Sequence, residues 1–135
     1  MNKGSVLEIA NVLVETLKYR NSGKELETTK ASKVIKIRTT FDIKQNPIAE
    51  KGAKNIYIRF LNPNGNILLN TGREQIFNTE SGEKKYSALK QLQYENKLIS
   101  VSMDFKRKNP LIAGDYLLEI YIDGILLGTR IFNLK

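Results

Sequence analysis

The segment GDYLLEIYIDGILLGTRIFNLK, residues 114–135, decides the fold of this chain. It predicts a single β-hairpin. Its first strand has a period of two, which places alternate side chains on one buried face: Tyr116, Leu118, Ile120 and Ile122. Asp123-Gly124 follows, a pair that tolerates positive φ and closes tight hairpins. We expect the returning strand to direct three side chains inward: Leu126, Phe132 and Leu134.

The composition is that of one globular domain that lacks the commonest catalytic groups. The chain has 135 residues, of which 41% are hydrophobic, and it contains no Cys and no His. Disulfides, thiolate metal sites and hydrolases with a histidine base are therefore excluded. No apolar run reaches the roughly 18 residues that cross a bilayer. We predict a protein that is not an enzyme, with no cofactor, no metal and no membrane insertion.

Other segments repeat the period-two pattern. The clearest is VIKIRTTFDI, residues 34–43, whose inward side chains are expected to be Ile35, Ile37, Thr39, Phe41 and Ile43. Strands are also predicted in NIYIRFL (55–61), with Ile56, Ile58 and Phe60 inward, and in its partner across the Asn62–Gly65 turn (66–70). A further strand is predicted in LISVSMDF (98–105), with one face made of Ile99, Val101, Met103 and Phe105. Frequent turn signals without a long helical pattern predict an all-β, antiparallel β-sandwich of about seven to nine strands.

Three segments are less clear. Residues 5–20 fit either a helix or a strand, and we prefer a strand from about Val12 to Arg20. Residues 1–11 are then an extended approach or the end of an upstream coiled coil, and residues 12–135 are the sandwich. Residues 25–33 are expected to be a polar connection. Between residues 71 and 97 we expect short strands near Gln75–Asn78, Lys84–Ser87 and Lys90–Tyr94, with a short helix over Tyr86–Leu92 as the alternative.

The net charge of +8 raises the question of an anionic partner. The basic residues are spread along the chain and interleaved with acids, which favours an ordinary solvated surface over an anion-binding face. Among the acids, Glu119 is interpreted as an outward strand residue facing solvent and Asp123 as a turn residue. The glycines near the hairpin are interpreted as turn or bulge positions rather than a phosphate loop.

A resemblance to a known family runs through five segments: NKGSVLEI, SGKELETTKASKVIKIRTTFDI, IAEKGAKNIYIRFLNPNGNIL, KKYSALKQLQYENK and AGDYLLEIYIDGILLGTRIFNLK. Together they resemble the C-terminal immunoglobulin-like module of uncharacterised, membrane-anchored coiled-coil proteins of Bacteroidota. The chain departs from that family at SMDFKRK (102–108), where an aromatic-rich strand with Trp is expected. The resemblance implies an immunoglobulin-like sandwich on the periplasmic side of the cell envelope, with a cytoplasmic location as the alternative. It carries over no catalytic residue.

The main functional hypothesis is a non-enzymatic protein-interaction or spacer module at the C-terminal end of a longer envelope-anchored coiled-coil protein. Its partner would be an unknown protein, with a homo-oligomer through the upstream coiled coil also open. The candidate interaction surface contains Tyr57, Arg59, Lys36, Arg38, Lys84 and Lys85. The first alternative is an electrostatic binder of nucleic acid or another anionic polymer, through the Lys36/Arg38 and Lys106–Lys108 surfaces. A carbohydrate-binding or carboxylate-based hydrolase sandwich is the third hypothesis.

Overall fold

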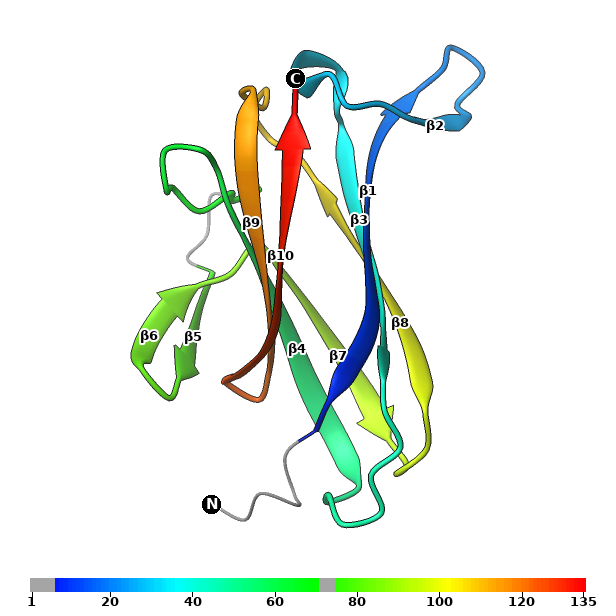
Figure 1. Ribbon diagram of the computed structural model, residues 1–135, viewed down its shortest axis with the longest axis vertical. Coiled ribbons are helices and arrows are strands. Elements are labelled where there is room, and N and C mark those ends of the chain that lie inside the picture. Colours follow the sequence, from blue (N-terminus) through cyan, green and yellow to red (C-terminus); the bar gives the residue numbers. More distant parts are fainter. Residues whose placement is uncertain (1–6, 71–74) are drawn as a thin grey trace.

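The computed structural model describes residues 7–70 and 75–135, and within them the chain is an antiparallel β-sandwich (Figure 1). Sheet 1 has the order β2 (Glu25–Glu27), β1 (Ile9–Tyr19), β3 (Lys36–Ile43), β8 (Ile99–Lys106). Sheet 2 has the order β10 (Ile125–Leu134), β9 (Gly114–Ile122), β4 (Gly52–Leu61), β7 (Ala88–Tyr94). A small hairpin of β5 (Ile76–Thr79) and β6 (Gly82–Lys85) lies outside the two sheets. The predicted all-β sandwich is confirmed.

The core lies between the two sheets, where the period-two patterns turn their apolar faces toward each other. The inward set of β4 is buried as expected: Ile56, Ile58 and Phe60. Across the gap, the ring of Phe60 lies 5.7 Å from the ring of Phe105 on β8. Burying each such large side chain contributes about 1.5–3 kcal/mol to the free energy of folding, most of it offset by lost chain entropy.

The hairpin of β9 and β10 forms as predicted. Ile122 pairs with Ile125, so the turn consists of Asp123 and Gly124, with φ of 50° and 84°. Positive φ at both positions is the signature of a type I′ turn, whose twist matches that of the strands. The Asp123 carboxylate also accepts a hydrogen bond from the backbone N–H of Asn55, 3.0 Å away.

The expected inward position of Leu126 is wrong. The register of β10 against β9 shifts between Leu126 and Gly128, which is a β-bulge that moves side chains to the other face. Leu126 is consequently 46% exposed, and Leu127 packs against the core instead. Beyond the bulge the alternation resumes, so Phe132 and Leu134 point inward as predicted.

The ambiguous segment at residues 5–20 is a strand where it is described. β1 begins at Ile9, earlier than the expected start near Val12, and a register shift beside Asn11 (φ 56°) interrupts its pairing with β3. Val12 and Val14 pack against the core after this bulge. The expectation for residues 1–6 lies outside the described residues.

Three other local predictions need correction. The polar connection at 25–33 contains strand β2, because the edge of β1 at Lys18 and its neighbours is open for it to pair with. Residues 66–70 make only the single bridge of Leu61 with Ile67 instead of a partner strand. The alternative helix over Tyr86–Leu92 is wrong, since most of it is strand β7, which gains backbone pairing with β4. Residues 71–74 are outside the described part.

A tyrosine corner supports the immunoglobulin-like character of the sandwich. The hydroxyl of Tyr116, near the start of β9, donates a hydrogen bond of 2.6 Å to the carbonyl of Ile112. The same hydroxyl accepts one of 3.1 Å from the N–H of Ile112. Such a bond from a strand tyrosine to backbone a few residues upstream is a hallmark of these folds. Within the described residues no helix has the length and apolarity needed to cross a membrane.

Candidate interaction surface

The outer face of sheet 2 carries rows of side chains that the strand register aligns across β4, β9 and β10. Residues facing each other on neighbouring strands form the cross-strand pairs that determine the chemistry of a sheet face. Three rows follow from the pairing: Tyr57–Tyr121–Leu126, Arg59–Glu119–Thr129 and Leu61–Leu117–Ile131. The first two rows lie toward the β5–β6 hairpin, and the third lies beyond it.

The β5–β6 hairpin covers much of the first row with aromatic contacts. The ring of Phe77, on β5, stacks on the ring of Tyr57 at a centroid distance of 4.2 Å. It also meets the ring of Tyr121 edge-on at 5.2 Å. Phe77 is 5% exposed, so the hairpin forms a small second core on this face. Burial raises the pKa of the Tyr57 and Tyr121 phenols above the usual value.

The second row contains an ion pair that the hairpin shields. The Arg59 guanidinium pairs with the Glu119 carboxylate, and the two side chains are only 11% and 16% exposed. Arg59 Nε also donates a hydrogen bond of 2.8 Å to the carbonyl of Lys85 on β6. The interpretation of Glu119 as facing solvent is therefore wrong. The physical reason is that Arg59 stands directly opposite it on β4 and the hairpin closes over both.

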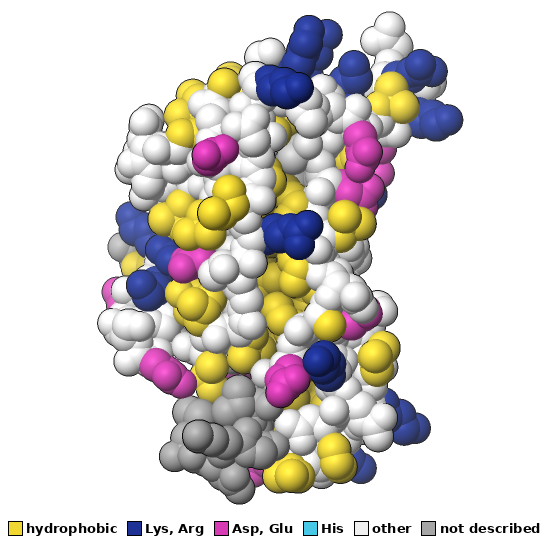
Figure 2. Space-filling view, viewed as in Figure 1, with side chains coloured by type: hydrophobic (Ala, Val, Ile, Leu, Met, Phe, Trp, Pro, Cys, Tyr) yellow, Lys and Arg dark blue, Asp and Glu magenta, His cyan; other side chains and the backbone are white. Residues whose placement is uncertain are grey.

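The third row is apolar and includes an exposed side chain. Leu61 and Leu117 are half-buried, whereas Ile131 on β10 is 70% exposed. β10 is an edge strand whose named pairing is with β9 alone, and its neighbour across the sandwich is β1 in the other sheet. The hydrophobic side chains along the middle of the face seen in Figure 2 lie where β10 and β1 run side by side in Figure 1. We call the free edge of β10 together with Leu61, Leu117 and Ile131 the β10 surface.

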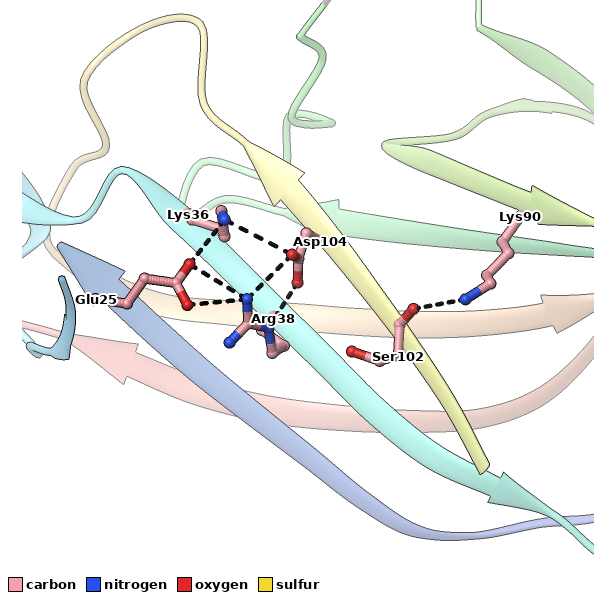
Figure 3. Close-up of polar contacts among 6 residues, drawn as sticks. All are labelled: Glu25, Lys36, Arg38, Lys90, Ser102 and Asp104. Atoms are coloured by element: carbon pink, nitrogen blue, oxygen red, sulfur yellow. Dashed lines mark hydrogen bonds and ion pairs between the residues drawn. The ribbon is translucent and has the colours of Figure 1, made fainter. Parts of the chain in front are cut away.

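The outer face of sheet 1 carries a network of paired charges (Figure 3). Lys36 Nζ lies 2.7 Å from a Glu25 carboxylate oxygen, and Arg38 Nε lies 2.8 Å from Oδ1 of Asp104. Arg38 also reaches Glu25, at 3.1 Å. Hydrogen bonds from Lys36 and Arg38 hold the pKa of Glu25 and Asp104, respectively, below the ordinary carboxyl values. These two cations are already paired within the domain.

The structure gathers four of the six predicted surface residues into one region and separates the other two. Tyr57 and Arg59 lie under the β5–β6 hairpin, and Lys84 and Lys85 are on its strand β6. Of these, Lys85 is exposed, whereas Tyr57 and Arg59 are largely covered. Lys36 and Arg38 lie on the other sheet.

Sequence reasoning did not single out Ile131. The signal was present in the alternation of β10, because residues that alternate with Phe132 and Leu134 must point outward. What sequence patterns do not show is that Leu117 and Leu61 stand beside Ile131 in the folded sheet, since that depends on the register of three strands.

Three hollows of the surface are lined mostly by neutral and basic side chains. One pocket of about 200 Å³ lies between the 62–69 and 107–112 segments and is lined by Asn62, Arg107 and Tyr116 among others. Among the described residues, the lining of this pocket and of two open grooves on sheet 1 contains one carboxylate, that of Glu27. The described residues contain no group of three or more acidic, His or Cys side chains that would hold a metal ion.

A family model matches residues 10–135 of the chain, which is nearly its whole length. The chain belongs to the DUF8428 family, a domain of unknown function. No curated protein sequence matches it significantly. The family assignment leaves the function to be argued from the structure.

Solved structures show the same fold at low sequence identity. Two crystal structures of a beta-glucosidase from Kluyveromyces marxianus, one in complex with glucose, match 97% of this chain at TM-score 0.52 with 12% and 13% identity. The chain spans only 14% of the length of that enzyme. An immunoglobulin-like protein from Pseudomonas aeruginosa matches 99% of this chain and 100% of its own, at TM-score 0.43 and 12% identity. Likeness at this level concerns the fold alone.

Proposed function

We propose that this domain is a non-enzymatic protein-interaction module that binds a partner protein through the β10 surface. The observation that carries the proposal is the position of Ile131, 70% exposed on an edge strand and in register with Leu117 and Leu61. An exposed apolar side chain on its own is ordinary, but a cross-strand apolar row that ends at an open sheet edge is not.

Backbone chemistry at the edge adds to the apolar contact. An edge strand presents unpaired N–H and C=O groups, and an extended segment of another protein pairs with them as an added strand. β10 runs from Ile125 to Leu134 without a proline, and the bulge beside Gly128 is its main irregularity. A partner strand would therefore gain backbone hydrogen bonds along β10 and a side-chain contact with Ile131 on the outer face.

The proposal includes the setting of the domain as the C-terminal module of a longer envelope-anchored protein. The resemblance to the C-terminal modules of coiled-coil proteins supports this setting. The beta-glucosidase match supports it in a general way, because in that enzyme the matched fold is 14% of a longer chain. In such a setting, a partner on the β10 surface would be held at a fixed distance from the membrane anchor.

The test compares two exposed isoleucines in the full-length protein. Ile131 and Ile48 are 70% and 65% exposed, and Ile48 lies in the loop between β3 and β4, away from β10. A photo-reactive amino acid placed at position 131 should cross-link to one defined protein in cells, and the same probe at position 48 should not. Ile131→Asp should lower the yield of that partner in co-purification at least tenfold, whereas Ile48→Asp should leave it unchanged.

Equal yields for the two aspartate variants, with both folded by circular dichroism, would contradict the placement of the interface. The non-enzymatic part has its own test. Hydrolysis of a glycoside by the purified domain, abolished by one carboxylate-to-amide substitution, would favour the hydrolase hypothesis instead. Binding on a glycan array that survives Ile131→Asp would favour the carbohydrate-binding hypothesis.

A further inference from the structure

One end of the sandwich collects cations that the domain does not neutralise. Two adjoining grooves on sheet 1 share Lys18 and Lys33 in their walls. Lys30 lines the first groove, and Arg20 and Arg107 line the second. In the described part of the chain none of these five side chains takes part in an ion pair. We call Lys18, Arg20, Lys30, Lys33 and Arg107 the basic end.

Tertiary structure assembles this cluster from three segments. Lys18 and Arg20 come from the end of β1, and Lys30 and Lys33 come from the connection between β2 and β3. Arg107 follows β8, and its Nε donates a hydrogen bond of 2.7 Å to the carbonyl of Val34, which ties the third segment to the second. Figure 2 shows dark blue side chains along the upper end of the molecule, where the C-terminus and the β1–β2 turn lie in Figure 1.

The contrast with the neighbouring cations is sharp. Lys36 and Arg38 lie on the same sheet, but Glu25 and Asp104 pair with both. The sequence suggested that Lys36 and Arg38 could bind an external anion, but both already pair with carboxylates of the domain. The basic end brings together five cations that form no ion pair among the described residues, and Glu27 is the one acidic side chain lining either groove.

Exposed apolar side chains lie at the same end. Ile112, in the loop that follows Arg107, is 43% exposed, and Tyr19, between Lys18 and Arg20, is 36% exposed. The loop bearing Ile112 is held in place by the two hydrogen bonds between the Tyr116 hydroxyl and the Ile112 backbone. Cationic side chains beside apolar or aromatic tips match the interface of an anionic bilayer, where phosphates meet the first acyl carbons.

We propose that the basic end is a docking surface for an anionic lipid membrane. Lys and Arg side chains contact lipid phosphates, and Ile112 and Tyr19 lie at the depth of the headgroups. The contact is peripheral, so no segment spans or inserts as a chain. A nucleic acid is the weaker match, because the exposed aromatic ring at this end, Tyr19, already has Lys36 Nζ 5.3 Å from its centroid and Ile112 offers a base no stacking surface.

This docking does not depend on the proposed protein interaction. The basic end lies at one end of the sandwich, whereas Ile131 lies on the outer face of sheet 2. A membrane at the end leaves the side of β10 accessible. A variant of the β10 surface therefore serves as a control in the vesicle experiment, and a variant of the basic end serves as a control in the partner experiment. Each proposal can fail without the other.

The test uses the 135-residue chain and vesicles in co-sedimentation. The chain should bind vesicles of phosphatidylcholine with one-fifth phosphatidylglycerol and should not bind pure phosphatidylcholine. Raising the salt from about 0.1 M to about 0.5 M should release it, because surface charges are screened. Lys30→Gln/Lys33→Gln should weaken binding by about thirtyfold, since each cation near an anionic surface contributes roughly a fivefold factor in affinity.

The matched control removes the same charge at the opposite end. Lys51 and Lys97 are exposed, lie in the loops before β4 and before β8, and form no ion pair among the described residues. Lys51→Gln/Lys97→Gln should keep wild-type binding. An equal loss in both double variants would overturn the proposal, because binding would then follow net charge alone.

A third variant separates a membrane from other polyanions. Ile112→Ser leaves the charge unchanged and should weaken vesicle binding by about threefold or more, because it removes an apolar contact with the interface. Unchanged binding would overturn the proposal. A single-stranded DNA oligonucleotide that binds more tightly than the vesicles at equal salt, through Lys30 and Lys33, would also overturn it and would identify nucleic acid as the ligand.

Discussion

Gly124 in the turn between β9 and β10 packs against the backbone of Asn78 in β5: a Cβ on Gly124 would lie 2.5 Å from the Asn78 carbonyl oxygen. The Gly124 carbonyl in turn accepts a hydrogen bond from the N–H of Glu80, at 3.2 Å. The turn that closes the last hairpin therefore also forms the contact on which the β5–β6 hairpin packs. One glycine links the strongest local signal in the sequence to the element that covers the outer face of sheet 2.

Gly124→Ala should lower the free energy of unfolding by about 3 kcal/mol or more. A positive φ costs a residue with a Cβ about 1–3 kcal/mol, and the clash with Asn78 adds to that strain. Gly65→Ala is the matched control, since Gly65 has a φ of 81° against 84° for Gly124 but no neighbour within 4 Å of its Cβ position. Urea unfolding of both variants measures the difference. Equal losses would show that the contact with Asn78 contributes nothing.

The shielded ion pair predicts an asymmetric response to substitution. Glu119→Gln should destabilise the domain by about 3 kcal/mol, because it leaves the Arg59 guanidinium covered without its counter-ion. The double variant Arg59→Met/Glu119→Met should recover most of that loss, since apolar side chains of similar volume suit a covered site. Thermal unfolding of the three proteins tests this. A double variant no more stable than Glu119→Gln would contradict it.

The charged network on sheet 1 predicts a loss of stability in acid. The hydrogen bond from Arg38 holds the pKa of Asp104 below its ordinary value of 3.8. A carboxyl whose pKa is lower in the folded than in the unfolded state stabilises the fold above the unfolded pKa, and this contribution is lost as the pH falls through the folded pKa. Urea midpoints should therefore fall below about pH 4, and Asp104→Asn should reduce this fall. Arg38→Gln should do the same, because it removes the cause of the shift. An Asp104→Asn profile parallel to the wild type would count against the pairing.

The last strand is required for folding. Removing residues 129–135 deletes Leu134, which is 1% exposed, and Phe132, whose ring stacks on Tyr116 at 5.3 Å. We expect no cooperative unfolding transition from this truncated chain. Leu134→Ala should still fold and lose about 2–5 kcal/mol, the usual cost of a buried leucine. A truncated chain with dispersed amide NMR signals would contradict the prediction.

Much of the fold was predictable because antiparallel strands with one wet face leave a period-two pattern in the sequence. β3, β4, β8 and β9 all follow that pattern, and their buried faces are the predicted ones. The errors occur where one residue changes the register. The bulge beside Gly128 turns Leu126 outward. The bulge beside Asn11 interrupts the alternation of β1, so the predicted start near Val12 was later than the observed start at Ile9. A bulge leaves no composition signal, because it depends on the partner strand.

The candidate surface was less predictable, since a side chain that points outward from a strand need not reach solvent. Tyr57 and Arg59 do point outward from β4, yet the β5–β6 hairpin covers them. The hairpin comes from residues 76–85, and no local sequence pattern predicts that it packs on the outer face of sheet 2. Ile131, by contrast, stays exposed because the hairpin does not extend to its row.

The amino-acid sequence alone determined most of the long strands, the turn that closes the last hairpin and most of the apolar faces, because φ preferences and period-two burial are local properties. The tertiary structure decided which charged side chains form ion pairs and which form none among the described residues. Glu25 reaches Lys36 and Arg38 because β2 folds back onto β1, whereas Lys18, Lys30 and Lys33 gather from separate segments and form no ion pair among the described residues, although Glu27 lines the same groove. Coulomb interactions act over a few ångströms in space, so charge pairing follows the fold and not the order of residues along the chain.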